Sequence, residues 1–296
     1  MRRCKPQLYF RTSTTMGQIN STLLQEAITT YKTVICQQSD ETKSLGRWIP
    51  NPNVDEARRL IGKSFAGTET VVGEPFGTWS RSHFGDWYTL DQHASLVSFG
   101  LGIPVRVAFQ NNALILAKSA STKGADDARD GEMAAVAVVT EVDKSQSKTW
   151  IGTVYESWQF FVALLKNIYV DGFSDMRKTF LHRHDYSMFG EKISAAMDSM
   201  QPHHPTQIHW YVMVIGTHPE HQGKGYGTAL MNLIAMLADR AGRTVFLECG
   251  ESNRAFYDKM GYQLVATEIV KDPVNSEGKP LTTYAMMRSP KSLIQK

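Results

Sequence analysis

The stretch Gln222-Gly223-Lys224-Gly225-Tyr226-Gly227, with Thr228 directly after it, decides how this chain folds. An apolar, β-branched run from Trp210 to Ile215 comes before it, which is typical of a strand. Apolar residues at helical spacing come after it, namely Tyr226, Leu230, Leu233, Ile234 and Leu237. Three glycines therefore stand where a strand turns into the N-terminus of a helix.

A turn of this kind can bind an anion. Glycine lets backbone N–H groups point outward together, and the first turn of a helix carries free N–H donors and a partial positive charge. The two features together suit a pyrophosphate. The spacing is not that of a Walker A loop, and Thr228 stands where G-x-G-x-x-G needs its third glycine. A glycine-rich turn without a ligand remains the alternative.

Length and charge set the class of protein. The chain has 296 residues, 42% of them hydrophobic and 21% charged, as in a soluble globular protein of one large domain or two small ones. The net charge of +3 is dispersed, so we expect neither a nucleic-acid nor a membrane partner. The run from Trp158 to Val170 is short for a membrane span and contains Lys166 and Asn167.

The cysteines and histidines indicate no metal site. The 3 cysteines are far apart in sequence and form no C-x-x-C, which favours a reducing, cytoplasmic location. His182 and His184 form an H-x-H, but no third ligand stands at a suitable spacing. We interpret them, and His203 and His204, as parts of ordinary solvated segments.

Residues 1–52 are expected to form an N-terminal extension, and residues 53–290 a single domain. The first 25 residues contain Arg2, Arg3, Lys5 and Arg11 and no acidic residue. An organelle-targeting segment has this composition, and so does a divergent or partly disordered N-terminus, so both interpretations stay open.

The rest of the chain predicts an α/β fold. Asn53 and Glu56 look like a capping box before a helix, and Glu156 to Val170 reads as a helix buried in the core. The remaining expected elements are a helix over 90–101, a hairpin of strands 105–109 and 113–117, strands over 133–142, 243–249, 262–266 and 282–287, and a helix over 253–260. The strand-helix-strand unit should be parallel and right-handed, within a mixed, mostly antiparallel twisted sheet with helices on both faces.

Two motifs in this order resemble the GNAT superfamily of N-acetyltransferases. Gln222, Gly225 and Gly227 form a Q-x-x-G-x-G that is similar to the acetyl-CoA loop of these enzymes. The run from Asn253 to Tyr262 resembles their N-x-x-F-Y-x-x-x-G-F/Y ending. The segments 209–211 and 218–223 also look like the subgroup that includes puromycin N-acetyltransferase. The resemblance is firm from His209 to Val265, and residues 53–200 fit the outline without a motif.

The resemblance implies acetyl-CoA as cosubstrate and no metal. Backbone N–H groups from Gly223 to Thr228 would hold the pyrophosphate, with Lys224 adding charge, and the pantetheine would pair with a strand edge at residues 215–217. Gly216 would permit a bulge or a close approach there, or simply end the strand. The implied cofactor-binding residues are Ile215, Gly216, Thr217, Gln222, Gly223, Lys224, Gly225, Tyr226, Gly227, Thr228 and Asn253. Asn253 could equally be only a helix N-cap.

The resemblance also implies catalytic residues. Tyr257 would be the general acid that protonates the thiolate, although it could be a packing aromatic. His209 and Glu248 are the candidates for the general base, with an ordered water or a purely structural role as alternatives. Counted by twos along a strand, His209 shares a face with Tyr211, Met213 and Ile215.

The implied function is acetyl-CoA-dependent transfer of an acetyl group to a primary amine of a small molecule. A CoA-binding sensor or scaffold without turnover, and an acetyltransferase acting on protein amines, are the alternatives. The acceptor pocket is expected from segments 65–88 and 155–190, with the aromatic residues Trp79, Phe84, Trp87 and Tyr88, and Glu74 and Glu132 as outside candidates. A monomer or a homodimer would serve equally.

Overall fold

The computed structural model describes residues 29, 48–49, 52–67, 79, 89–110, 113–119, 132–144, 150–171, 183–274 and 276–291. The strands are β1 Trp48–Ile49, β2 Leu114–Ser119, β3 Met133–Val142, β4 His209–Thr217, β5 Val245–Gly250, β6 Gln263–Val270 and β7 Leu281–Arg288. The helices are α2 Val54–Ala66, α4 Leu90–Gln110, α5 Trp150–Asp171, α7 Arg183–Met200, α8 Tyr226–Ala241 and α9 Glu251–Lys259. Short 3-10 turns are η2 Gln201–His203 and η3 Pro219–His221.

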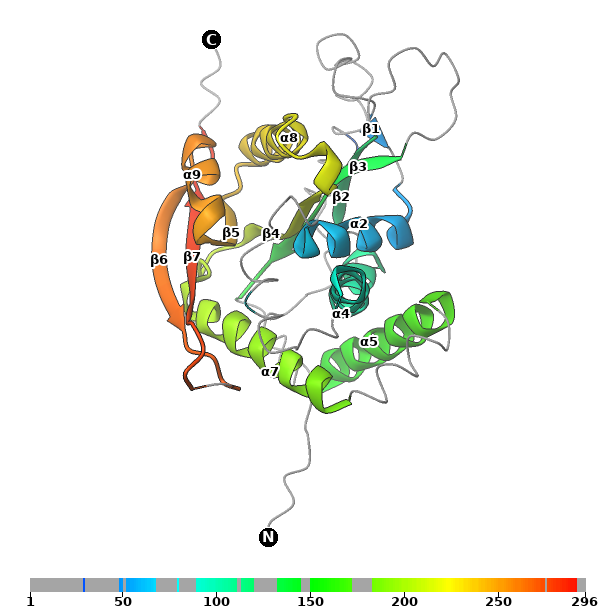
Figure 1. Cartoon of the computed structure of the whole chain (residues 1–296). Coiled ribbons are helices and arrows are strands. Elements are labelled where there is room, and N and C mark those ends of the chain that lie inside the picture. The colour runs from blue at the N-terminus through cyan, green and yellow to red at the C-terminus, as the bar shows by residue number, and fades with distance from the viewer. Residues whose placement is uncertain are drawn as a thin grey trace.

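The strands form one seven-stranded sheet in the order β1-β2-β3-β4-β5-β7-β6. All neighbouring pairs are antiparallel except β4 and β5, which are parallel and joined by α8. Helices α8 and α9 cover one face, and α2, α4 and α7 lie on the other (Figure 1). The predicted fold class, a mixed and mostly antiparallel sheet with a parallel strand-helix-strand unit, is confirmed.

The parallel pair is short. β4 pairs with β3 along its whole length, from His209 opposite Val142 to Thr217 opposite Ala135. Its pairing with β5 is limited to Trp210 opposite Val245 and Tyr211 opposite Phe246. Within the described ranges, the edge of β4 that faces β5 therefore has no strand beside it after Tyr211, and β4 and β5 diverge from this point.

A bulge in β4 changes which side chains share a face. Val139 lies opposite Val212 and Val138 opposite Val214, so Met213 is the extra residue. Before the bulge, Trp210 and Val212 lie on the α8 side, whereas after it Ile215 lies there. His209 and Ile215 therefore do not share a face, and the prediction from strict alternation is wrong.

Residues 105–109 are helical, so the predicted hairpin is wrong, although its second strand, β2, exists. Val105 and Ala108 are fully buried in the cluster that α2 and α4 share. Arg106 binds Asp55 of α2 and Asn167 of α5. These contacts hold the β-branched residues in a helix, because tertiary packing overrides the weak local preference for a strand.

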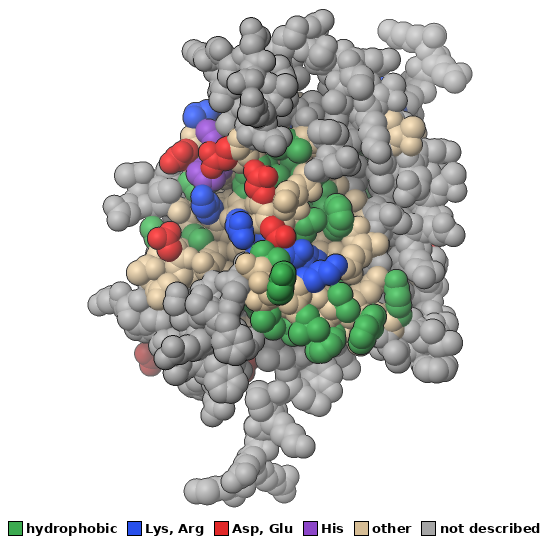
Figure 2. All heavy atoms as spheres, turned by 90° about the vertical axis from the view of Figure 1, so that its right-hand side faces the viewer, with side chains coloured by type: hydrophobic (Ala, Val, Ile, Leu, Met, Phe, Trp, Pro, Cys, Tyr) green, Lys and Arg blue, Asp and Glu red, His purple; other side chains and the backbone are tan. Residues whose placement is uncertain are grey.

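α5 is confirmed as a helix, but the expectation that it lies buried in the core is wrong for most of its large residues. Its buried side chains, Gln159, Ala163 and Asn167, fall four residues apart and face α4. Trp158 is 61% exposed and Tyr169 89% exposed. Figure 2 views the side of the molecule that α5 borders, where hydrophobic side chains gather along the lower part.

Asn53 is confirmed as the N-cap of α2, because its Oδ1 accepts hydrogen bonds from the N–H groups of Asp55, at 2.8 Å, and Glu56. Glu56 does not complete a capping box. Its Oε1 instead accepts a hydrogen bond of 3.0 Å from the N–H of Met133 and so ties α2 to the start of β3. In the ranges that the structure describes, no helix is both long and apolar enough to cross a membrane.

A buried ion pair attaches α7 to the loop between β6 and β7. Lys192 Nζ lies 2.8 Å from Asp272 Oδ2, and the two side chains are 0% and 2% exposed. The Lys192 ammonium also donates to the carbonyl of Trp79. This link fixes the helix that leads into the segment before β4.

We predict that Asp272→Ala lowers the free energy of unfolding by about 3–5 kcal/mol, because it removes the carboxylate that lies against the buried Lys192 charge. Urea unfolding measures the change. Asp258→Ala, which removes an exposed i,i+4 pair with Arg254, is the control and should cost at most about 1 kcal/mol. Similar losses in both variants would contradict the prediction, whereas replacing Lys192 and Asp272 together by Met and Leu should recover most of the stability.

Candidate functional site

The glycine turn has the predicted shape. β4 ends at Thr217, η3 follows, and Gly223 and Gly225 have φ angles of 72° and 89° before α8 begins at Tyr226. These left-handed conformations strain any residue that has a Cβ atom. Gly225 is the N-cap and offers no side-chain acceptor, and the first backbone bond of the helix joins Ala229 N–H to its carbonyl. The turn therefore presents the amino end of α8 without a side-chain cap.

Positive charge lies beside this turn. Gln222, Gly223, Lys224 and Thr228 are exposed, whereas Tyr226 is buried and anchors the turn in the core. Lys224 Nζ lies 3.4 Å from His221 Nδ1, and Gln222 Nε2 donates to the carbonyl of Thr217. The exposed residues and the amino end of α8 suit an anionic group.

A second lysine, not foreseen from the sequence, reaches the same place from α2. Lys63 Nζ lies 3.4 Å from His218 Nε2, in the segment between β4 and η3. Burial, and then the Lys63 ammonium, lower the pKa of His218 from its usual 6.5, so the ring is neutral near pH 7. Glu132 Oε1 lies 3.8 Å from the same nitrogen. Lys63 is far from the turn in sequence, and no spacing rule could have placed it there.

The end of β4 packs against helices on both faces. Ile215 contacts the core on the α8 side. A Cβ atom on Gly216 would come within 3.2 Å of Ser64 Cβ and 3.4 Å of Leu60 Cδ2, both on α2. Gly216 therefore permits the close approach of α2. The bulge that we considered at Gly216 occurs at Met213 instead.

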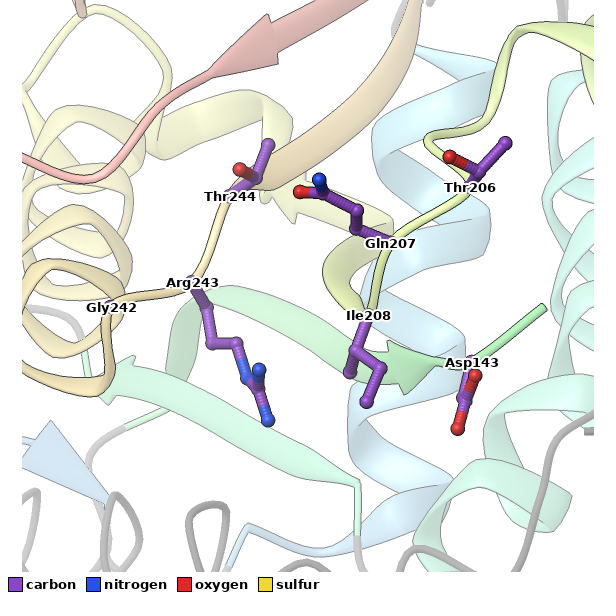
Figure 3. Close-up of a pocket in the computed structure, with 7 residues that line it drawn as sticks. All are labelled: Asp143, Thr206, Gln207, Ile208, Gly242, Arg243 and Thr244. Carbon is purple, nitrogen blue, oxygen red and sulfur yellow. The ribbon is translucent and has the colours of Figure 1, made fainter. Parts of the chain in front are cut away.

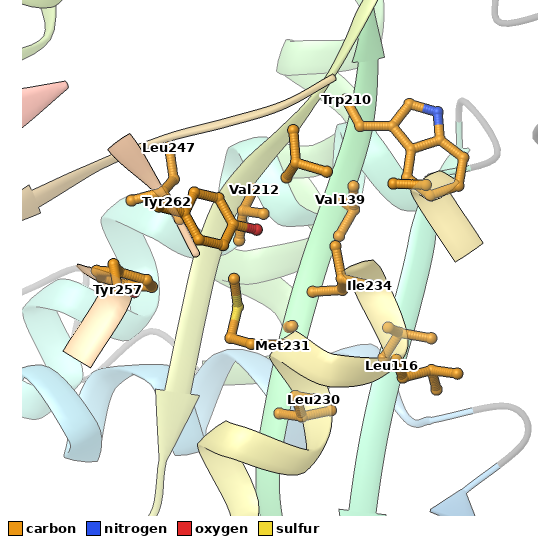
Figure 4. Packing of buried hydrophobic residues seen from close by; sticks show 14 of the residues in the cluster. Leu116, Val139, Trp210, Val212, Leu230, Met231, Ile234, Leu247, Tyr257 and Tyr262 are labelled. Carbon is orange, nitrogen blue, oxygen red and sulfur yellow. The ribbon is translucent and has the colours of Figure 1, made fainter. Parts of the chain in front are cut away.

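α9 follows β5 without a gap. Its N-cap is Gly250, which makes no side-chain hydrogen bond, and Asn253 lies inside the helix. The interpretation of Asn253 as an N-cap is therefore wrong. Tyr257 is buried, with its ring centroid 5.1 Å from Phe256 and 5.9 Å from Tyr262. Figure 4 shows Tyr257 and Trp210 at opposite margins of this cluster.

Glu248 lies on β5 just past the point where β4 and β5 diverge. Its Oε2 accepts a hydrogen bond of 2.7 Å from the Tyr211 hydroxyl, and its Oε1 lies 3.0 Å from His204 Nε2. Burial, and then the Glu248 charge, raise the pKa of Tyr211 well above its usual 10.0, so Tyr211 remains a neutral donor. The Glu248 side chain is 20% exposed, so this end of the cluster is partly open to solvent.

His209 is fully buried. Its Nδ1 lies 2.8 Å from the carbonyl oxygen of Gln207, and its Nε2 lies 3.2 Å from His204 Nδ1. Burial, only partly offset by the bond to Gln207, lowers the pKa of His209 from 6.5 to about 4. Its contact with His204 connects it to Glu248.

His204 is the residue that the sequence interpretation missed. It is buried against the rings of Tyr211 and Phe246, with centroids 4.9 Å and 4.3 Å away, and it joins Glu248 to His209. The interpretation of His204 as solvated is wrong. Its partner Glu248 is 44 residues away in sequence, so no local pattern reveals the pair.

Glu248 and Tyr257 lie on opposite faces of the sheet. Glu248 shares its face with Tyr211 and Phe246, which pack toward the end of α7, whereas Tyr257 belongs to the core under α8. Both come from the β5–α9 unit, beside the diverging strands. A general acid and a general base would therefore lie on opposite sides of the gap where β4 and β5 diverge.

The expected acceptor residues are only partly described. Trp79 is buried, and its indole N–H donates to the carbonyl of Lys279, 2.9 Å away, in the loop before β7. This contact makes it a structural residue near α7. Glu74, Phe84, Trp87 and Tyr88 lie outside the described residues.

A separate hollow of about 330 Å³ lies at the amino ends of β4 and β5 (Figure 3). It is lined by Asp143, Thr206, Gln207, Ile208, Gly242, Arg243 and Thr244. Because β4 and β5 are parallel, this hollow and the glycine turn lie at opposite ends of the pair. Within the described part of the chain, no group of three or more His, Cys, Asp or Glu side chains could hold a metal ion.

Residues 171–262 match the Acetyltransferase (GNAT) family. The matched segment runs from the end of α5 through the glycine turn to Tyr262 and covers less than half of the chain. The GNAT resemblance is confirmed for this segment, and membership of the puromycin N-acetyltransferase subgroup stays a prediction.

Several solved structures are similar in outline. A histone acetyltransferase HPA2 and related acetyltransferase from Corynebacterium glutamicum has 15% identity and a TM-score of 0.45, with 85% of this chain and 99% of that chain covered. Arylalkylamine N-acetyltransferase 2 from Aedes aegypti has 13% identity and a TM-score of 0.46, with 83% and 99% covered. A polyamine N-acetyltransferase from Drosophila melanogaster has 13% identity and a TM-score of 0.40, with 81% and 97% covered.

The buried His209 makes stability depend on pH. Its pKa is about 4 in the folded chain and near 6.5 when unfolded, so the unfolded state binds the proton first as pH falls. The stabilisation is complete above pH 6.5 and is lost toward pH 4. We predict that His209 accounts for a loss of about 3 kcal/mol in unfolding free energy across this window, and that His209→Gln removes that slope.

Urea unfolding at a series of pH values tests this slope. His203→Gln is the matched control, because the half-exposed His203 pairs with Glu268 and lies outside the His204–His209 contact. Parallel stability curves for the wild type and His209→Gln would refute the assignment.

Proposed function

We propose that this chain is an acetyl-CoA-dependent N-acetyltransferase that transfers the acetyl group directly to a primary amine of a small molecule. One observation carries the proposal: the left-handed Gly223 and Gly225 expose the amino end of α8 beside an edge of β4 that has no neighbouring strand among the described residues. The match of residues 171–262 to the Acetyltransferase (GNAT) family supports it.

The residues present fit the cosubstrate. The N–H groups from Gly223 to Thr228 would receive the pyrophosphate, with Lys224 and Lys63 supplying positive charge. The peptide groups of residues 215–217 offer a strand edge to the amides of the pantetheine, and Asn253 lies near the start of α9 as a further polar contact. Acetyl-CoA supplies the acetyl group as a thioester.

Two side chains would perform the proton transfers. Glu248 accepts a proton from the ammonium of the acceptor, which frees the nitrogen lone pair to attack the thioester carbonyl. Tyr257 donates a proton to the thiolate when the C–S bond breaks. Their positions on opposite faces of the sheet support the division of roles, because the acceptor and the thioester would approach the opening from different sides.

An amine-panel assay tests the function itself. The purified chain is mixed with acetyl-CoA and small primary amines, and free thiol release is followed. Release that depends on the amine supports the proposal. Acetyl-CoA binding without thiol release with any small amine, or with a lysine-containing peptide, would instead favour a CoA-binding sensor or scaffold.

The glycine turn gives a binding prediction. We expect Gly225→Val to weaken acetyl-CoA binding at least about 10-fold, a loss of about 1.4 kcal/mol, because valine cannot adopt the φ of 89° without moving the turn. Titration calorimetry measures the affinity. Gly242→Val is the matched control, since Gly242 has a φ of 60° at the other end of α8 and open space around it. Equal affinity in the two variants would refute the anion site.

The acid role gives a kinetic prediction. Tyr257→Phe should lower kcat by about 10²-fold while acetyl-CoA affinity changes little, because only the proton donor is lost. Tyr262→Phe removes a hydroxyl from the same core, one with no hydrogen-bond partner among the described residues, and should leave kcat unchanged. Steady-state kinetics compare the two, and unchanged turnover in Tyr257→Phe would remove Tyr257 from the acid role.

A further inference from the structure

Four groups form a continuous chain of contacts on the α7 side of the sheet. Glu248 Oε1 lies 3.0 Å from His204 Nε2, and His204 Nδ1 lies 3.2 Å from His209 Nε2. His209 Nδ1 in turn lies 2.8 Å from the carbonyl oxygen of Gln207. Each of the three contacts joins two atoms that can form a hydrogen bond only if a proton lies between them.

The number of protons shared among these four groups decides how many of the three contacts can be hydrogen bonds. Both of its ends, the Gln207 carbonyl and the Glu248 carboxylate, only accept hydrogen bonds, and a neutral imidazole carries one N–H. His204 and His209 therefore bring two protons to three contacts. With both rings neutral and Glu248 ionised, two lone pairs must face each other at one contact. One added proton completes all three hydrogen bonds.

The surroundings place the added proton at the outer end. Burial lowers the pKa of His209 to about 4, so that ring stays neutral and donates from Nδ1 to Gln207. His204 must then donate from Nδ1 to His209, which leaves the contact between His204 Nε2 and Glu248 Oε1 without a proton. This contact lies at the partly exposed end of the series of contacts, since the Glu248 side chain is 20% exposed.

Other charged and titratable groups face the same place. Tyr211 of β4 occupies the second oxygen of Glu248 as a neutral donor, since its pKa is raised by burial and by Glu248. Lys144, after β3, donates to the carbonyls of Gln201 and His204. His203 of η2 pairs with Glu268 of β6. None of these groups supplies a proton to the contact between His204 and Glu248.

We propose that His204 is a positioning residue that makes Glu248 a one-proton acceptor for the amine substrate. The inference rests on the proposed acetyltransferase function and adds a residue to it. When both rings are neutral and Glu248 is ionised, the 3.0 Å contact between His204 Nε2 and Glu248 Oε1 has no proton to share. Uptake of one proton turns this contact into a charge-assisted hydrogen bond, which is stronger than one between neutral groups.

The reaction then balances. The ammonium of the acceptor gives one proton to Glu248, and this proton fills the contact with His204. The nitrogen lone pair forms the C–N bond, the C–S bond breaks, and the thiolate takes a proton from Tyr257. The second proton that the nitrogen loses returns to Tyr257. The proton shared by Glu248 and His204 leaves to solvent, so the products are the amide, the free thiol and one proton.

Nuclear magnetic resonance on the intact chain tests the proton count without any turnover. With labelled histidine and glutamate, the His204 ring and the Glu248 carboxyl carbon should titrate together in one step, while His209 keeps the neutral Nδ1–H form down to a pH of about 4. His209 in the Nε2–H form, or a His204 titration that leaves Glu248 unchanged, would overturn the inference.

Steady-state kinetics with two amines test whether His204 helps Glu248 to deprotonate the substrate. Ethylamine and trifluoroethylamine are similar in size, but only ethylamine is mostly protonated near neutral pH. His204→Gln should lower kcat/KM for ethylamine by about 10²-fold. For trifluoroethylamine, which arrives largely deprotonated, the same variant should change kcat/KM only slightly. Glutamine can still donate to Glu248 but cannot hold a second proton.

His203→Gln is the matched control and should change neither rate, since it replaces the neighbouring histidine and its contact with Glu268. Equal losses for both amines in His204→Gln would show a structural role and overturn the inference, and so would no loss for either. If the wild type binds acetyl-CoA but acetylates neither these amines nor any of the wider panel, the proposed function fails, and the resonance experiment alone then decides the proton count.

Discussion

The divergence of β4 from β5 after Tyr211 is the constraint on which the rest of the site depends. The two parallel strands share only the pairs Trp210–Val245 and Tyr211–Phe246. The Met213 bulge then turns β4, while β5 runs directly into α9 at Glu251. Peptide groups along the freed edge need partners, because unpaired backbone groups are costly when they are shielded from water. A ligand with amide groups of its own would complete them, and the glycine turn lies at the end of that same edge.

The sheet separates the two kinds of proton transfer. Tyr257 lies under α8 in the larger core, whereas Glu248 lies on the other face with Tyr211 and His204. On the Glu248 face, α7 is held against the β6–β7 loop by the buried pair of Lys192 and Asp272, and it leads through η2 to His204.

What the sequence could predict follows from the range of each interaction. The glycine turn and α8 were predicted because a left-handed glycine and a helical stripe are local features, and β3 was predicted because it is buried on both faces. The helical structure of residues 105–109 was not predicted, because it depends on the contacts of Arg106 with Asp55 and Asn167, which are far away in sequence. His204 was not identified as a site residue for the same reason, since only the fold brings it to Glu248. The bulge at Met213 also has no recognisable pattern in the local sequence, yet it determines on which face of the sheet Ile215 lies.

The two faces of β5 differ in a way that packing alone does not explain. On one face, Leu247 and Cys249 fill the core with apolar side chains. On the other, Glu248 lies among Tyr211, His204 and the fully buried His209. Apolar residues there would stabilise the fold at least as well, because burying polar groups has a desolvation cost that their hydrogen bonds only partly offset. Here the cost is greater still, since two neutral imidazoles between two acceptors leave one contact without a proton. A cluster that lacks one proton stabilises the fold poorly but accepts a proton well, and its accessible end is the carboxylate beside the diverging strands.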